Sequence, residues 1–144
     1  MVPADGWEKA YRDELKNYIE LSDGKAIAVD QALRVDTGTK GTDVVSAYLK
    51  QLQGKMTGAQ LGTVKTLDVQ NDKLSVGMGS IRGTRATSQG SVKLNYFVII
   101  SVRKSDGLSV LTALITDSST DPSGYSDPFL QMAESLLNSQ LKAP

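Results

Sequence analysis

A segment rich in Gly, Ser and Thr near the middle of the chain has the composition of a phosphate-binding loop. Its glycines Gly77, Gly79 and Gly83 are spaced as G-x-G-x-x-x-G, one residue longer than the dinucleotide-binding motif. A phosphate loop must also open a helix, so that free N–H groups and the helix dipole meet the anion. Here strand-forming residues and the turn TSQGS follow, and GTRATSQG lacks the Lys and the hydroxyl of a P-loop. We therefore interpret residues 79–92 as a β-hairpin.

The loop DSSTDPSGYSDP offers the hard oxygen ligands that Ca²⁺ prefers. The ligands would be Asp117, Ser119, Asp121 and Asp127. The loop does not match an EF-hand, because Pro122 stands at the glycine position and Pro128 at the position of the bidentate Glu. Asp, Ser, Pro and Gly also build ordinary turns between a strand and a helix. We interpret the loop as such a turn, with a cation site as the alternative.

Two residue types that often carry catalysis are missing from the sequence. The sequence contains no Cys and no His, which excludes disulfides, thiol nucleophiles, the usual zinc ligands and a Ser-His-Asp triad. Ser101 and Lys104 have the S-x-x-K spacing of some acyl enzymes, but residues three apart on a strand point to opposite faces. By the same rule Arg82 and Arg85 form no joint anion clamp. No pair of carboxylates stands out, so we predict no catalytic residue, no metal and no cofactor.

The composition is that of one globular domain spanning residues 1–144. Hydrophobic residues make up 40% and charged residues 22%, which is typical of a folded core rather than a disordered chain. The 16 Lys and Arg cancel the 16 Asp and Glu and are scattered along the sequence, which argues against nucleic acid as a partner. No apolar run reaches the roughly 18 residues of a membrane span. The start, MVPADGWEK, lacks the pattern of a signal peptide.

The N-terminal segment has a helical pattern. Asp5 and Glu8 have capping-box spacing. The large side chains then recur at helical intervals, at Trp7, Tyr11, Leu15, Tyr18 and Ile19. We predict a helix over residues 6–21, followed by a strand in which apolar residues occupy odd positions, at Ile27, Val29, Leu33 and Val35. The aromatic side chains are interpreted as core contacts, with an aromatic binding face as the alternative.

A second helix is expected to begin at an N-cap, Thr42, and to stop at Gly54. Its core face would carry Val45, Tyr48, Leu49 and Leu52. After residue 60 the pattern changes to strands, with TVKTLDV and KLSVGM on either side of a tight turn at residues 71–72.

The clearest strands in the sequence are VKLNYFVIISV and LSVLTALIT. Phe97 and Ile99 interrupt the polar side of the first, so we expect its middle to be buried on both faces, and a central place for the second. A last helix follows, with Asp127 as cap and Pro128 in the first turn. Its core stripe would be Phe129, Met132, Ala133, Leu136, Leu137 and Leu141. The predicted fold is α+β, a twisted and mainly antiparallel sheet with helices packed on it.

The order of these elements resembles the PsbP-like fold. The resemblance rests on P-x-x-G-W at Pro3 to Trp7, on DVVSAYLKQL at Asp43 to Leu52, on GTRAT, on GLSVLTALITD, and on an aspartate-rich loop before a helix with ESL. It covers about residues 42–141. In that group the Gly-Trp segment belongs to strands, whereas the capping pattern here predicts a helix. Either that helix prediction is wrong or the chain begins differently.

The PsbP-like group includes an extrinsic photosystem subunit, a Ran-binding import factor and extracytoplasmic lipoproteins of the LpqN type. The resemblance implies a binding or accessory role without a shared catalytic constellation, and, for bacterial members, export and lipid anchoring. We therefore expect a non-enzymatic binding module, secreted or lipid-anchored in a bacterium, with a protein or small-ligand partner. The alternatives are a small hydrolase or lyase using Asp/Glu or Ser/Lys, and the extracytoplasmic sensor domain of a membrane protein. The absence of Cys leaves a cytoplasmic location open.

Overall fold

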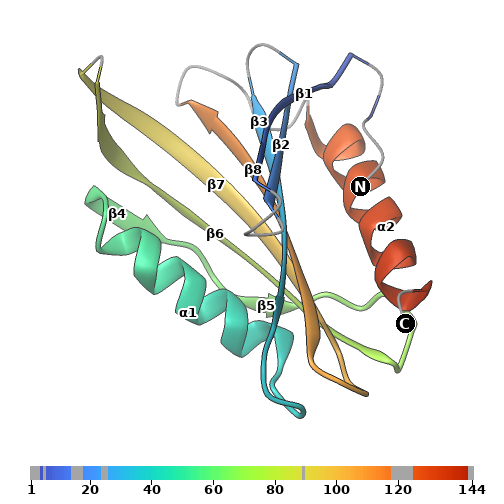
Figure 1. The fold of residues 1–144 in the computed structure, drawn as a ribbon. Coiled ribbons are helices and arrows are strands. Elements are labelled where there is room, and N and C mark those ends of the chain that lie inside the picture. Colours follow the sequence, from blue (N-terminus) through green and yellow to red (C-terminus); the bar gives the residue numbers. More distant parts are fainter. Residues whose placement is uncertain are drawn as a thin grey trace.

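The computed structural model describes residues 4, 6–13, 18–23, 26–88, 90–117 and 125–142. It is an antiparallel sheet with one helix on each face, as Figure 1 shows. The strands are β1 (Glu8–Asp13), β2 (Tyr18–Ser22), β3 (Ile27–Arg34), β4 (Thr57–Leu61), β5 (Lys65–Thr66), β6 (Leu74–Thr87), β7 (Gly90–Arg103) and β8 (Leu108–Asp117). The helices are α1 (Gly41–Gln53) and α2 (Ser126–Lys142). The predicted α+β class, with helices packed on a mainly antiparallel sheet, is confirmed.

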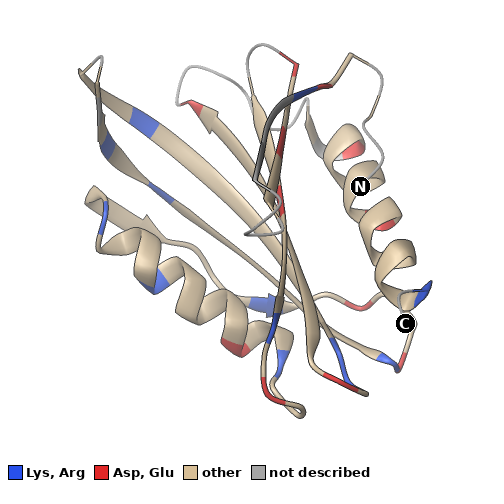
Figure 2. Ribbon diagram, viewed as in Figure 1, with Lys and Arg blue, Asp and Glu red and all other residues tan. Residues whose placement is uncertain are grey.

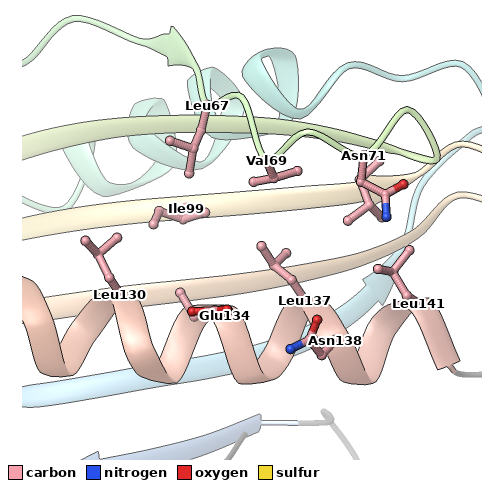
Figure 3. Close-up of a pocket in the computed structure, with 11 residues that line it drawn as sticks. Leu67, Val69, Asn71, Ile99, Leu130, Glu134, Leu137, Asn138 and Leu141 are labelled. Atoms are coloured by element: carbon pink, nitrogen blue, oxygen red, sulfur yellow. The ribbon is translucent and has the colours of Figure 1, made fainter.

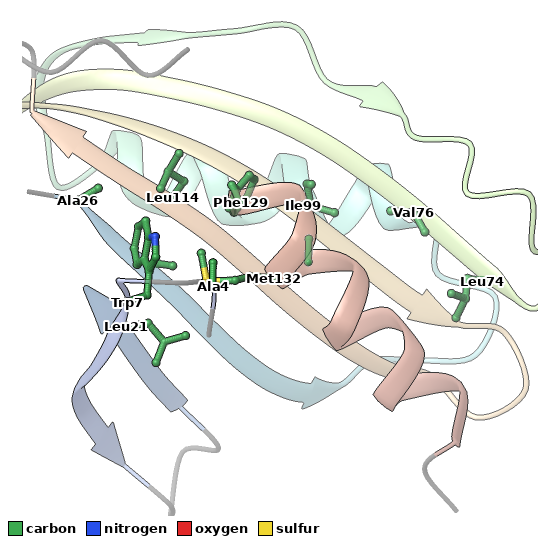
Figure 4. Close-up of a cluster of buried hydrophobic side chains, with 12 residues drawn as sticks. Ala4, Trp7, Leu21, Ala26, Leu74, Val76, Ile99, Leu114, Phe129 and Met132 are labelled. Atoms are coloured by element: carbon green, nitrogen blue, oxygen red, sulfur yellow. The ribbon is translucent and has the colours of Figure 1, made fainter. Parts of the chain in front are cut away.

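The sheet has the order β1-β2-β3-β8-β7-β6-β4, with β5 paired to β6. Strand β8 is therefore the middle strand, as its apolar sequence predicted. Two buried clusters flank the sheet. The cluster under α1 contains Val29, Val45, Leu49, Leu52, Ile81, Tyr96, Val98, Ile100, Leu111 and Ala113. The cluster under α2, drawn in Figure 4, contains Ala4, Trp7, Leu21, Ala26, Ala28, Leu74, Val76, Ile99, Leu114, Phe129, Met132 and Ala133.

The predicted helix over residues 6–21 is wrong. Strands β1 and β2 form an antiparallel pair there, and β2 pairs with β3 along its whole length. The side chains of β2 alternate: Ile19 and Leu21 face the α2 cluster, whereas Tyr18 packs against the α1 cluster. This alternation was hidden because Tyr18 and Ile19 also fit helical spacing. Pairing with a strand distant from the local pattern decided the conformation.

Helix α1 begins one residue earlier than the predicted cap. Lys40 occupies the N-cap position and its side chain makes no cap hydrogen bond, so Thr42 is not the cap. The first amide is satisfied from the sheet instead, because the N–H of Gly41 donates to Oγ of Ser75 at 3.0 Å. The helix ends at Gln53 with Gly54 as its C-cap, as predicted, and buries Val45, Leu49 and Leu52.

The glycines of the central segment allow α1 to approach β6 closely. A Cβ added at Gly77 would lie 2.6 Å from the Thr42 nitrogen and 2.7 Å from the carbonyl carbon of Gly41. A Cβ at Gly79 would lie 2.9 Å from Cγ1 of Val45 and 3.0 Å from Cδ1 of Leu49. The glycines are therefore required by helix–sheet packing.

Helix α2 begins at Ser126, so Asp127 lies within the first turn and is not the cap; Pro128 lies in the first turn, as predicted. Four residues of the predicted stripe are buried and Leu137 and Leu141 are partly buried. The end of the helix is fixed by Gln140, which the stripe did not include. Its Nε2 donates to the carbonyls of Ser101 at 3.0 Å and Leu108 at 2.8 Å.

Candidate functional site

The glycine-rich segment is a β-hairpin, as predicted. Strands β6 and β7 pair from Leu74 and Arg103 to Thr87 and Gly90, and no helix follows the glycines. Within that hairpin, Arg82 and Arg85 lie on opposite faces and have different partners. Nε of Arg82 donates to Oε1 of Gln60 at 2.7 Å, and Nη1 of Arg85 donates to the hydroxyl of Tyr96 at 2.8 Å. A phosphate loop is absent from this part of the described chain.

The aspartate loop is only partly described. Asp117 ends β8 and Asp127 lies in the first turn of α2, whereas Ser119 and Asp121 lie outside the described residues. Among the residues that the structure describes, no three His, Cys, Asp or Glu side chains gather as metal ligands would.

The structure separates Ser101 from Lys104, but for a different reason than the strand alternation we expected, because Lys104 lies beyond the end of β7. Ser101 is fully buried on β7, and Lys104 is exposed in the turn that follows.

Neither helix in the described ranges is long and apolar enough to cross a membrane.

Two carboxylates have strongly shifted pKa values in opposite directions. Hydrogen bonds from Arg103, from the Leu108 N–H and from Arg34 hold the pKa of Asp106 well below its usual range. Asp30 is buried on β3 beside Thr112 of β8, and this burial raises its pKa to about 6. Neither residue lines any of the hollows described below, so neither has the placement of a catalytic acid or base in a cleft.

Trp7, Tyr18 and Tyr48 pack in or against the core, as predicted. Trp7 is buried and meets Tyr125 edge-on, with ring centroids 5.9 Å apart and an interplanar angle of 83°. Tyr18 and Tyr48 pack against the α1 cluster. Burial raises the pKa of Tyr48 to about 12. The side chain of Tyr11 lies outside the described residues.

The first hollow lies between α2 and the segment that leads from β5 into β6, and we call it the α2 groove. Its volume is about 350 Å³. Figure 3 shows leucines of α2 facing residues 67–71 across it. Its walls are apolar: Leu67, Val69, Ile99, Leu130, Leu137 and Leu141. Asn71, Glu134 and Asn138 supply its polar groups. Sequence reasoning missed the groove because it assigned Leu137 and Leu141 to the core.

The second feature is a polar surface on the half of the β6–β7 hairpin that α2 does not cover, and we call it the arm surface. Two adjoining hollows of about 510 and 400 Å³ share Gln60, Arg82 and Asn95. We define the arm surface by Gln60, Arg82, Lys93, Asn95 and Phe97, which share one face of the sheet. Phe97 was expected to be buried; its side chain is 37% exposed, whereas Ile99, two residues along the same face, is 5% exposed. The reason is that Ile99 packs in the α2 cluster and Phe97 does not.

The fold defines the class of protein: a single-sheet α+β protein with one helix on each face, whose described residues line an apolar groove and a polar surface. Comparison of the chain with models of known protein families and with curated proteins finds no match.

Proposed function

We propose that this chain is a non-catalytic binding module that takes a small apolar ligand in the α2 groove. The observation that carries the proposal is the groove itself. Its volume of about 350 Å³ falls within the roughly 300–1,000 Å³ of ligand sites, and apolar walls with a few polar groups are typical of such sites. The Leu130 side chain stands at the groove 52% exposed, an apolar surface that a ligand would cover.

The chemistry of the described side chains supports binding rather than catalysis. The chain has no thiol or imidazole, and the two carboxylates with strongly shifted pKa values lie outside the three hollows. Asp106 is held in a two-point ion pair by Arg103, with a shortest distance of 2.6 Å. Glu134 is the carboxylate of the groove, and the other polar groups there are amides.

The resemblance to the PsbP-like group supports the same class of function, because its members act as binding or accessory proteins. From it we also propose an exported bacterial protein, secreted or lipid-anchored. Fusion of the native gene product to alkaline phosphatase, which is active only outside the cytoplasm, tests the location. An active fusion supports export, and an intact but inactive one places the protein in the cytoplasm.

The groove is tested with N-phenyl-1-naphthylamine, a neutral probe that fluoresces in apolar surroundings. We expect saturable binding that Leu130→Gln weakens by about fivefold, because half of a leucine surface is worth roughly 1 kcal/mol. Leu61→Gln is the matched control, since Leu61 is similarly exposed, at 47%, but lies outside the groove. Absence of binding, or equal weakening by both variants, would contradict the proposal.

A further inference from the structure

We propose that the arm surface binds an acidic segment of a partner protein, with Arg82 and Lys93 holding its carboxylates and Phe97 receiving an apolar side chain. This site is separate from the α2 groove. Their lining residues do not overlap, so each can be tested without the other.

The two cations lie on one face of the hairpin. Arg82 is paired with Asn95, and Thr84 with Lys93, so Arg82 and Lys93 are diagonal neighbours on the same face. Like charges at such positions repel, and a bound anion relieves that repulsion. Among the described residues neither cation pairs with a carboxylate. Arg82 donates its Nε to the neutral Gln60, which leaves the terminal nitrogens of the guanidinium for a two-point contact with a carboxylate.

The two hairpin strands that carry the arm surface contain no acidic residue, and Asp117 at the end of the neighbouring strand β8 pairs with Leu94, on the other face. Residues 44–105 contain nine Lys and Arg, and their acidic residues are Asp68 and Asp72. Both aspartates lie in the segment that leads from β5 to β6, and Figure 2 shows β6 and β7 with blue bands and no red ones. The zero net charge of the chain therefore conceals a basic half. An acidic partner is the complement of such a surface.

An apolar side chain, Phe97, lies on the same face as these cations. It lines the larger hollow with Arg82 and is one of the three large hydrophobic side chains exposed in the described chain. Leu61 lines that hollow from the other face, because it pairs with Ile81 of the α1 cluster. Arginine together with an aromatic ring is typical of the energetically important centre of a protein interface. The partner segment should therefore carry an apolar residue among its acidic ones.

The same features favour a protein over a nucleic acid. Sites for single-stranded nucleic acid use several aromatic rings for successive bases and many phosphate contacts. Two aromatic residues line the larger hollow, but Tyr96 is buried in the α1 cluster, so Phe97 is the exposed ring. Arg82 and Lys93 are the cations of the two hollows. Residues 1–43 and 106–144 carry fourteen acidic and seven basic residues, which would repel a long polyanion.

The test is a titration of the ¹⁵N-labelled chain with the synthetic peptide Glu-Asp-Leu-Asp-Phe-Glu-Glu, capped at both ends and followed by amide chemical shifts. We expect shifts confined to residues 58–62, 80–84 and 93–97, with an affinity that falls as salt is raised. Arg82→Gln combined with Lys93→Gln should weaken binding at least about tenfold, equivalent to 1.4 kcal/mol. Phe97→Thr, which keeps both charges, should weaken it by a smaller factor.

The matched control is Lys50→Gln combined with Lys65→Gln, which removes the same charge from exposed positions outside the arm surface. It should leave the affinity within about twofold of the unmodified chain. Equal weakening by the control, shifts centred elsewhere, or no shifts at all would overturn the proposal. Tighter binding of oligothymidylate at the same amides would also overturn it, in favour of a nucleic acid. Leu130→Gln should leave the peptide titration unchanged, so failure at the groove and failure at the arm are distinguishable.

Discussion

Asp30 and Asp106 differ in what their surroundings do to a negative charge. Asp106 receives hydrogen bonds from two arginines and a backbone N–H, which favour the charged form. Asp30 is buried on β3, where loss of water disfavours the charged form. At the scale of the residue, the two carboxylates should therefore make stability depend on pH in opposite senses.

We predict that Asp30→Asn stabilises the protein at neutral pH. The pKa of Asp30 is about 6 in the folded state and near 4 when unfolded, so the folded state binds more protons between these values. Its contribution to stability therefore falls as pH rises from about 4 to about 6 and stays low above that. Urea unfolding at about pH 7.5 should show a gain of roughly 2–3 kcal/mol, and almost none at about pH 4. A loss at pH 7.5 would instead mean that the charged form makes a stabilising contact.

We predict that Asp106→Asn destabilises the protein at neutral pH and flattens its acid unfolding. The pKa of Asp106 is lowered by folding, so its contribution is present above the unfolded value and is lost as pH falls through the folded one. The urea midpoints of variant and unmodified chain should therefore converge at low pH. Asp72→Asn, at an exposed turn, is the control and should not change the curve. A constant difference at every pH would show that Asp106 acts by its shape rather than its charge.

At the scale of the element, β6 is shaped by what lies on it. A Cβ at Gly77 would meet backbone atoms of α1, and backbone cannot rotate away as a side chain can. Ser75 also satisfies the first amide of the helix. The strand and the helix start are thus fitted to each other.

We predict that Gly77→Ala lowers the free energy of unfolding by about 2–3 kcal/mol, because α1 must shift to admit the methyl group. Gly54→Ala is the control. It sits at φ −66, and its added Cβ would meet only Gln51 and Lys50 oxygens, at 3.6 Å and 3.9 Å. It should be neutral or gain up to about 1 kcal/mol. Urea unfolding measures both. Equal effects of the two variants would argue against close packing at Gly77.

At the scale of the whole molecule, one sheet joins two cores. The middle strand β8 contributes Leu111 and Ala113 to the α1 cluster and Leu114 to the α2 cluster. Loss of packing on one face should therefore weaken the other, which is the behaviour expected of one domain.

We predict that the chain unfolds in one transition. Trp7, the only tryptophan, lies in the α2 cluster and reports on that face by fluorescence, while circular dichroism reports on all elements. Val45→Ala removes buried volume from the opposite cluster. It should lower the free energy of unfolding by about 1–2 kcal/mol and shift the urea midpoints of both probes equally. Separate midpoints for the two probes would divide the molecule into two cooperative units.

Part of the arm surface could be predicted from the sequence. Alternation along a strand correctly separated Arg82 from Arg85. Placing Arg82 beside Lys93 needed the register of the hairpin, and the exposure of Phe97 needed the position of α2. Predicting the α2 groove likewise needed the position of the helix, because that position leaves Leu130 exposed and Leu137 and Leu141 only partly buried.

The sequence by itself determined the elements whose signals are local. Helices α1 and α2, the β6–β7 hairpin and the central strands β7 and β8 follow from hydrophobic period and turn residues within short segments, although both predicted N-caps, Thr42 and Asp127, were wrong. Only the tertiary structure decided the rest. Residues 8–13 and 18–22 are strands because β2 pairs with β3 and β1 pairs with β2. The glycines of β6 allow α1 to pack closely on the sheet. The arm surface is exposed because the α2 cluster includes Ile99 but not Phe97. These outcomes depend on contacts between segments distant in sequence, whose free energy outweighs local preference.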